Sequence, residues 1–420
     1  MSSSSTPRAL EWFIAIGALF VLSDALDRAF HSVSSATASV PLARAIVIPF
    51  FAAALLVLVR EGRAAAAAVA AAWPVLLLVG LAAASLLWST DPSVTTRWIA
   101  GLMGTTAVGV FLAVRFDVDA QLEATCAALA AVLIVSAAAL IFLPEIGTRF
   151  TSRGFAWLGA FEENNLFGRA MSLSALAFFV LALQRPRLRP VAIAGCAASA
   201  VAVVESRSLN ALLVVCACVI AVAVAVRLRG MGRAARRRAL IVATLAAAVV
   251  AGIVALSGDR AVVLAGRDAT LTGRTTLWRA VLQMSRERPW LGHGYGTFWP
   301  RAEVAIAAPP DRPKTWTPRH PHNGLLEILF ELGTVGVLAF VVPFLLLLRC
   351  ALALAVTRGA SLWPLAYLLF LALGNIAESS LLRHKIFWAL YVAVAVRLAL
   401  SGAPRAGCVG VVEYRPAPGV

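Results

Sequence analysis

The chain has 420 residues, 61% of them hydrophobic, with a mean hydropathy of +0.86 and a formal net charge of +16. A soluble domain is about 45–50% apolar, so this composition excludes an ordinary soluble protein and predicts an all-α polytopic membrane protein. The positive charge is almost entirely arginine. The largest basic loop is predicted to lie on the outer face of the membrane. Positive charge at that place favours phosphorylated lipids or sugars over nucleic acid as partners.

Apolar runs able to cross about 30 Å of hydrocarbon predict twelve membrane spans. They are 10–23, 40–59, 64–87, 98–114, 122–143, 166–183, 190–204, 209–226, 239–257, 324–348, 361–375 and 386–400. The first run has neither a strongly basic start nor a small-residue cleavage site, which favours a span over a signal sequence. No separate soluble domain or internal repeat is expected, so residues 1–420 form one membrane domain.

Arginines distinguish two alternating sets of loops. The short, basic set lies around 60–63, 115, 185–189, 227–238, 349–358 and 397–405. Basic loops stay in the cytoplasm, so both termini are predicted to be cytoplasmic. The other set, which faces the periplasm or the exterior, is 24–39, 88–97, 144–165, 205–208, 258–323 and 376–385.

The large outer loop, 258–323, contains ten basic and five acidic residues. A helix is predicted at 275–287, which Pro289 ends. The turn Gly292–Gly296, with glycine at every second position, is expected to be tight and closely packed, and a proline-rich segment returns to the membrane in an extended form. The loop tryptophans either anchor it at the lipid headgroups or stack on sugar rings; they are Trp278, Trp290, Trp299 and Trp316.

Histidine is the first candidate for chemistry, because all five histidines fall on the predicted outer face: His31, His293, His320, His322 and His384. An imidazole titrates near neutral pH and takes a proton from an attacking hydroxyl as a general base. His322 precedes a span that would hold it, although it could instead only cap the helix. His320 is expected to be structural, and His293 to order its glycine turn.

Two arginines are candidates for binding a diphosphate. Arg207 lies between two apolar runs, where an arginine costs roughly 2.5–3.5 kcal/mol; pairing with Glu205 is the alternative. Arg274 is at the predicted start of a helix, where exposed amides and a guanidinium both suit phosphate. Together they would hold a diphosphate without a metal.

A second polar cluster, Glu162 and Glu163 with Arg169, is predicted at the outer start of a span. It could hold an acceptor, pair with the arginines or cap the helix. The only Asp-x-Asp sequence, Asp117-Val118-Asp119, is predicted on the inner side as a solvated loop. We therefore expect chemistry without a metal or cofactor. The six cysteines form neither a disulfide framework nor a zinc pattern and are expected to pack as apolar residues.

Four blocks of the sequence resemble the O-antigen ligase and polymerase superfamily of bacterial membrane glycosyltransferases. They are Gly159–Gly168; Ser206–Ser208; Gly273–Trp278 with Pro289–Phe298; and His320–Glu327 followed by Leu332–Gly336. The resemblance implies a GT-C-like helical fold and inverting transfer of a glycan from undecaprenyl diphosphate at the periplasmic face of the inner membrane. The family's functional histidine directly precedes an asparagine, which matches His322 and Asn323; its arginines match Arg207 and Arg274.

Within this superfamily an O-antigen ligase is favoured, because its acceptor, a hydroxyl of lipid A-core, belongs to a phosphorylated lipid that suits the arginine-rich outer face. The alternative is a polymerase acting on the same donor. A protein O-oligosaccharyltransferase is less favoured, because only about twenty residues follow the last predicted span. A lipid-linked glycan flippase is also less favoured, because neither related halves nor polar sites at the membrane midplane are predicted.

Overall fold

The computed structural model describes residues 8–25, 36–151, 154–229, 231–232, 274–298 and 321–401. Several predicted features lie outside these residues: the span 239–257, the loop segments 258–273 and 299–320, and the side chains of His31, His320, Trp299, Trp316 and Cys408. Arg274 is described as part of a helix, without its side chain.

The described chain is mostly α-helical. Its α-helices are α1 Ala9–Val21, α3 Ala36–Arg60, α4 Gly62–Ala71, α5 Trp73–Ala84, α6 Pro92–Arg115, α7 Val118–Phe142, α8 Pro144–Gly147, α9 Asn164–Gln184, α10 Arg189–Glu205, α11 Leu209–Leu228, α13 Arg274–Ser285, α15 Gly324–Ala355, α16 Trp363–Gly374 and α17 Ile386–Leu400. Two 3₁₀ turns, η1 Ser85–Leu87 and η2 Pro186–Leu188, join them. The short helix predicted in the large loop is present as α13.

Six helices among the described residues are long and apolar enough to cross a membrane, by length and composition: α6, α7, α9, α10 together with η2, α11 and α15. The pair α3 and α4, bent by 105° at Glu61, would make a seventh. Four shorter apolar helices, α1, α5 with η1, α16 and α17, lie where spans were predicted. The multi-pass helical class is therefore confirmed, whereas the count of twelve spans stays a prediction.

A β-hairpin was not predicted. Strands β1 (Thr148–Thr151) and β2 (Gly154–Trp157) form an antiparallel hairpin in which Phe150 faces Phe155. The two rings contact each other edge to face, and such cross-strand aromatic pairs stabilise a hairpin. The hairpin is a small addition to a mostly helical protein, and it was too short to give an alternating signal in the sequence.

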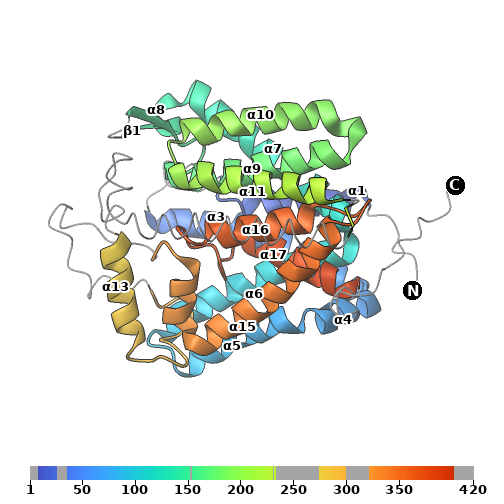
Figure 1. Cartoon of the computed structure of the whole chain (residues 1–420). Coiled ribbons are helices and arrows are strands. Elements are labelled where there is room, and N and C mark those ends of the chain that lie inside the picture. The colour runs from blue at the N-terminus through green and yellow to red at the C-terminus, as the bar shows by residue number, and fades with distance from the viewer. Residues whose placement is uncertain are drawn as a thin grey trace.

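The helices pack around α16 and α17, which lie in the middle of the bundle. Figure 1 shows α9, α10 and α11 on one side of this pair and α5, α6 and α15 on the other. Nearly every residue of α17 is buried, and most of α9 is too. A helix that is apolar all round is expected in such a position.

Polar side chains connect the predicted inner loops at one end of the bundle. Arg115, at the end of α6, lies 3.0 Å from Glu11 in α1 and 2.9 Å from Glu61 between α3 and α4. Arg229 donates hydrogen bonds to the carbonyls of Ala355 and Ala360. These contacts bring together loops that the arginine pattern assigned to one side of the membrane.

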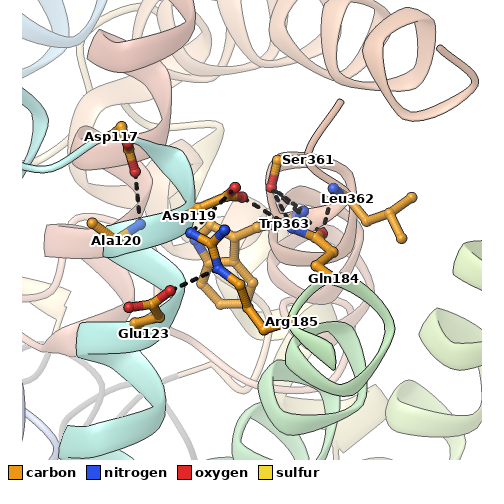
Figure 2. Close-up of polar contacts among 9 residues, drawn as sticks. All are labelled: Asp117, Asp119, Ala120, Glu123, Gln184, Arg185, Ser361, Leu362 and Trp363. Carbon is orange, nitrogen blue, oxygen red and sulfur yellow. Dashed lines mark hydrogen bonds and ion pairs between the residues drawn. The ribbon is translucent and has the colours of Figure 1, made fainter. Parts of the chain in front are cut away.

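The Asp-x-Asp sequence lies at the same end of the bundle, where its aspartates contact the ends of neighbouring helices (Figure 2). Asp117 caps α7 by accepting a hydrogen bond from the Ala120 amide at 2.8 Å. Asp119 accepts one from Gln184 at 3.0 Å and lies 3.5 Å from Arg185, which also donates to Glu123 at 2.8 Å. Burial alone would lower the pKa of Arg185, but the bond to Glu123 and the neighbouring carboxylates raise it. The two aspartates thus have separate structural partners.

The predicted outer loops meet at the opposite end. Lys385 pairs with Asp24, and the Thr90 amide donates to the His293 carbonyl at 2.9 Å. Trp88 donates to the Leu291 carbonyl at 3.0 Å. The candidate site is built from these outer connections.

Candidate active site

His322 lies directly before α15 and faces a carboxylate from a distant part of the chain. Its Nδ1 is 3.4 Å from Oε2 of Glu378, in the loop between α16 and α17. The Glu378 side chain is 4% exposed and that of His322 is 23% exposed. His322 has a left-handed backbone, with φ of 51°, a conformation uncommon for residues other than glycine. Sequence analysis did not select Glu378, since no motif precedes or follows it.

The helix cap of α15 is Asn323 and not His322. Its Oδ1 accepts hydrogen bonds from the amides of Leu325 and Leu326 at 3.1 and 3.0 Å, as expected of an N-cap asparagine. Its Nδ2 donates to the Ile376 carbonyl at 3.1 Å. Asn323 therefore fixes both the start of α15 and the loop that carries Glu378.

The glycine that follows allows the same loop to approach closely. The Gly324 amide donates to the Asn375 carbonyl at 3.0 Å, and a Cβ at this position would lie only 2.5 Å from Oδ1 of Asn375. The three residues of the His-Asn-Gly sequence thus have distinct physical roles, since the imidazole faces Glu378, the amide caps the helix, and the glycine leaves room for the loop.

The Gly292–Gly296 turn docks into a break in α15. The helix is interrupted at Gly333, where φ is 66°. The amides of His293 and Gly294 donate to the carbonyls of Phe330 and Glu331, both at 2.9 Å, and the amide of Thr334 donates to the Pro289 carbonyl at 2.8 Å. Backbone groups freed by a break inside a membrane need such partners. The predicted span 324–348 is consequently a discontinuous helix.

His293 lies at the centre of this junction. Its side chain is fully buried and stacks on Phe330 with ring centroids 4.5 Å apart. Its Nδ1 is 3.3 Å from the Phe330 carbonyl, and Nε2 is 3.5 Å from Glu287. This geometry is that of a residue that orders the turn.

Two buried carboxylates on α15 form an ion-pair network that sequence analysis missed. Glu327 and Glu331 are each 2% exposed; Arg383 pairs with Glu327 and lies 4.0 Å from Glu331. The guanidinium of Arg383 also lies over the ring of Trp98, at 4.4 Å, and burial lowers the pKa of Arg383 to about 10. The sequence contained a signal for this network: Glu327 and Glu331 are two acidic residues, four positions apart, in an apolar span. Ionisable residues inside a membrane span are functional candidates by default.

Arg207 and Arg169 occupy different environments. Arg207 is 44% exposed, has a φ of 55°, and lies 3.5 Å from Glu205, the pairing considered as an alternative. Arg169 is buried: its Nη1 donates to Ser380 at 2.6 Å and its guanidinium lies 4.7 Å from the Phe387 ring centre. Ser380 is in the loop of Glu378, so Arg169 contacts the same loop as His322 does.

The other predicted residues lie further out. Glu163 is exposed and Glu162 partly so; the Glu162 carbonyl accepts a hydrogen bond from Arg149 at 3.0 Å. Glu163 is the N-cap residue of α9 but does not cap the helix with its side chain. Arg274 begins α13, and one turn later Trp278 donates to the Pro321 carbonyl at 2.8 Å, which packs α13 against the segment preceding His322.

The chain resembles known proteins over part of its length. Residues 192–341 match the O-antigen ligase family, a segment that includes Arg207, Arg274 and His322. Over 115 residues the chain is 27% identical to the exopolysaccharide production protein ExoQ of Rhizobium meliloti (strain 1021), a match that covers 25% of each protein. The chain thus spans about a quarter of the length of this relative. These partial matches show that residues 192–341 are similar to the O-antigen ligase family and support a relation to the O-antigen ligase and polymerase superfamily.

Proposed function

We propose that this protein transfers an O-antigen glycan from undecaprenyl diphosphate to a sugar hydroxyl of lipid A-core. The similarity of residues 192–341 to the O-antigen ligase family supports the class of activity. The observation that carries the proposal is the pairing of His322 with the buried Glu378 at an end of the bundle rich in arginine. A histidine oriented by a carboxylate is the arrangement that general-base catalysis on a hydroxyl requires.

In the proposed reaction, Nε2 of His322 takes the proton of the acceptor hydroxyl. The acceptor oxygen forms a bond to C1 of the donor sugar, and the bond from C1 to the diphosphate oxygen breaks. The diphosphate leaves with the electron pair, and the anomeric centre inverts. Glu378 orients the imidazole through Nδ1 and stabilises the imidazolium that forms.

Arg207 and Arg274 are proposed to bind the diphosphate. Charge-assisted hydrogen bonds contribute roughly 1.5–3 kcal/mol each, and they strengthen as negative charge develops on the leaving group. The exposure of Arg207 and the position of Arg274 at the start of α13 support this role. The diphosphate itself supplies the driving force, so no metal or cofactor is included.

We further propose twelve spans, cytoplasmic termini and a site that faces the periplasm from the inner membrane, with 258–323 as its outer loop. This topology is supported by the contacts between loops described above. Each of them joins two loops of the inner set or two loops of the outer set, and the two sets lie at opposite ends of the bundle. Arg115 with Glu11 and Glu61 is an example at the inner end.

The second candidate is a glycan polymerase. The similarity to an exopolysaccharide production protein favours it, because the same base and the same donor would then serve an acceptor hydroxyl on another lipid-linked glycan. The two candidates differ only in the molecule that presents the hydroxyl.

The test is a transfer assay with purified protein in detergent, undecaprenyl-diphosphate glycan and lipid A-core, with products resolved on a gel. Glycan on lipid A-core, lost by roughly 10²–10⁴-fold in His322→Ala and retained in the lipid-facing control Leu213→Ala, would establish the ligase. Longer lipid-linked glycan with unmodified lipid A-core would establish the polymerase. Transfer is expected to persist in EDTA; its loss and recovery with magnesium would contradict the metal-free mechanism.

A further inference from the structure

The β1–β2 hairpin displays aromatic side chains on the side that faces away from the bundle. Phe150 and Phe155 lie opposite each other in the hairpin and are 73% and 65% exposed. Successive side chains of a strand point to opposite faces, and on the other face Ala156 is completely buried. The hairpin therefore packs on the protein through its Ala156 face and leaves its aromatic face uncovered.

Hydrogen bonds hold the hairpin in this orientation. Arg149, on the same face as Ala156, donates to the Glu162 carbonyl at 3.0 Å. At the base of the hairpin, the amides of Leu158 and Gly159 donate to the Gly147 carbonyl at 2.7 and 3.1 Å. Because these bonds join the hairpin to the segment before α9, the direction of the aromatic face is fixed relative to the bundle.

The aromatic face continues an apolar surface that begins on the membrane-spanning helices. Ile141 and Phe142, in the last turn of α7, are exposed, and α7 leads through α8 into β1. On the other strand, β2 packs against α10, whose Val201 and Val204 are also exposed. Both α7 and α10 are long and apolar enough to cross a membrane. Large exposed apolar surfaces mark contacts with partners or with membranes, and the surface here runs from two spans onto the hairpin.

The backbone of the hairpin limits how deeply it can lie. A two-stranded sheet has two open edges, whose N–H and C=O groups need water or lipid headgroups as partners. Open edges exposed to lipid do not occur within the hydrocarbon region. An apolar face that rests on a membrane is buried roughly 5–10 Å into the boundary between headgroups and acyl chains, which leaves the edges of the hairpin at headgroup level.

A lipid surface fits this face better than a sugar chain does. The rings of Phe150 and Phe155 meet edge to face, with an angle of 75° between their planes, so they form no shared flat platform for a sugar ring. Thr148, on the same face, already donates its hydroxyl to the Pro144 carbonyl at 2.7 Å. Lipid requires neither a flat platform nor a hydrogen-bond donor.

We propose that the β1–β2 hairpin is an interfacial anchor whose partner is the lipid surface. Phe150 and Phe155 lie among the headgroups and the upper acyl chains, at the end of the bundle where Figure 1 also shows α13. Because Arg149 joins the hairpin to Glu162, the anchor also sets the level of the start of α9 relative to the lipid. This contact goes beyond the transfer reaction and does not depend on it.

Spin labels test the anchor in the full-length protein, without its native cysteines, in phospholipid vesicles. Single labels are attached in Phe155→Cys, in Ile134→Cys on the exposed side of α7, and in Gln283→Cys, which is exposed on α13. Paramagnetic resonance measures collisions of each label with oxygen, which concentrates in hydrocarbon, and with a water-soluble nickel chelate. We expect the label at 155 to be less accessible to nickel than the label at 283 and more accessible than the label at 134.

A second substitution tests the contribution of the neighbouring ring. Phe150→Ser should raise the nickel accessibility of the label at 155, because half of the aromatic face is lost. Leu213→Ser, which replaces an exposed apolar residue of α11, should leave it unchanged. Equal unfolding midpoints of the two variants control for misfolding, and the comparison of the three labels does not require either variant.

Two results would overturn the anchor. One is a label at 155 that is as accessible to nickel as the label at 283. The other is a label at 155 that loses mobility when glycan released from its lipid by mild acid is added to the vesicles, which would assign the aromatic face to sugar. Neither measurement involves turnover, so a failure of the proposed transfer reaction would leave the result intact.

Discussion

At the scale of single residues, the two neighbours of His322, Asn323 and Glu378, have different roles. Asn323 caps α15 and holds the loop at Ile376, so the imidazole does not need to serve the helix. Glu378, only 4% exposed, is a buried carboxylate that faces Nδ1 of the imidazole. In the proposed mechanism Glu378 acts through His322 and does not itself contact the substrate.

Glu378→Gln tests this positioning role. We expect transfer to fall about 10- to 100-fold, less than in His322→Ala, because an amide still contacts the imidazole but no longer stabilises its charged form. A wild-type rate would remove Glu378 from the mechanism, and thermal unfolding of the variant controls for misfolding.

At the scale of elements, the break in α15 is the feature that shapes the site. The first part of the helix carries Glu327 and Glu331 toward Arg383, and the Gly292–Gly296 turn supplies the hydrogen bonds that the break releases. Two features of the structure require glycine at position 333. Its φ of 66° is in the left-handed region, and a Cβ there would lie 2.3 Å from the backbone of Trp290.

Gly333→Ala should therefore lower the free energy of unfolding by about 1–3 kcal/mol from backbone strain alone, with the clash adding to this. The matched control is Gly80→Ala in α5, where an added Cβ meets nothing within 4 Å. Unfolding midpoints in detergent measure both. Equal midpoints for the two variants would show that the junction between the turn and α15 is not formed in the protein.

At the scale of the whole molecule, loops assigned to two sides by their arginines meet at two ends of the bundle. Substituted-cysteine labelling tests the orientation in intact cells, in a background without the native cysteines. Gln283→Cys on α13 should react with a membrane-impermeant thiol reagent, and Arg187→Cys on η2 should react only after permeabilisation. Both positions are exposed. The reverse pattern would invert the proposed topology.

The sequence alone determined the features that depend on local chemistry. The length of an apolar run is set by the thickness of a bilayer, and arginine placement by insertion, so helix positions and the two sets of loops could be predicted. The position of His322 at the start of a helix was predicted in the same way, but the capping considered for His322 is carried out by Asn323. The short hairpin at 148–157 lacked a pattern long enough to detect.

Only the tertiary structure decided which distant residues meet. Glu378 reaches His322 across two helices, and Arg383 reaches Glu327 from the other end of the same loop. The break in α15 is stable because the turn containing His293 supplies its hydrogen bonds, and Arg169 of α9 contacts Ser380 only because the helices pack together. Such pairs form when the helices pack so that few charges and backbone groups are left without partners. This condition applies to the whole chain, so the partners of a residue cannot be predicted from the sequence around it.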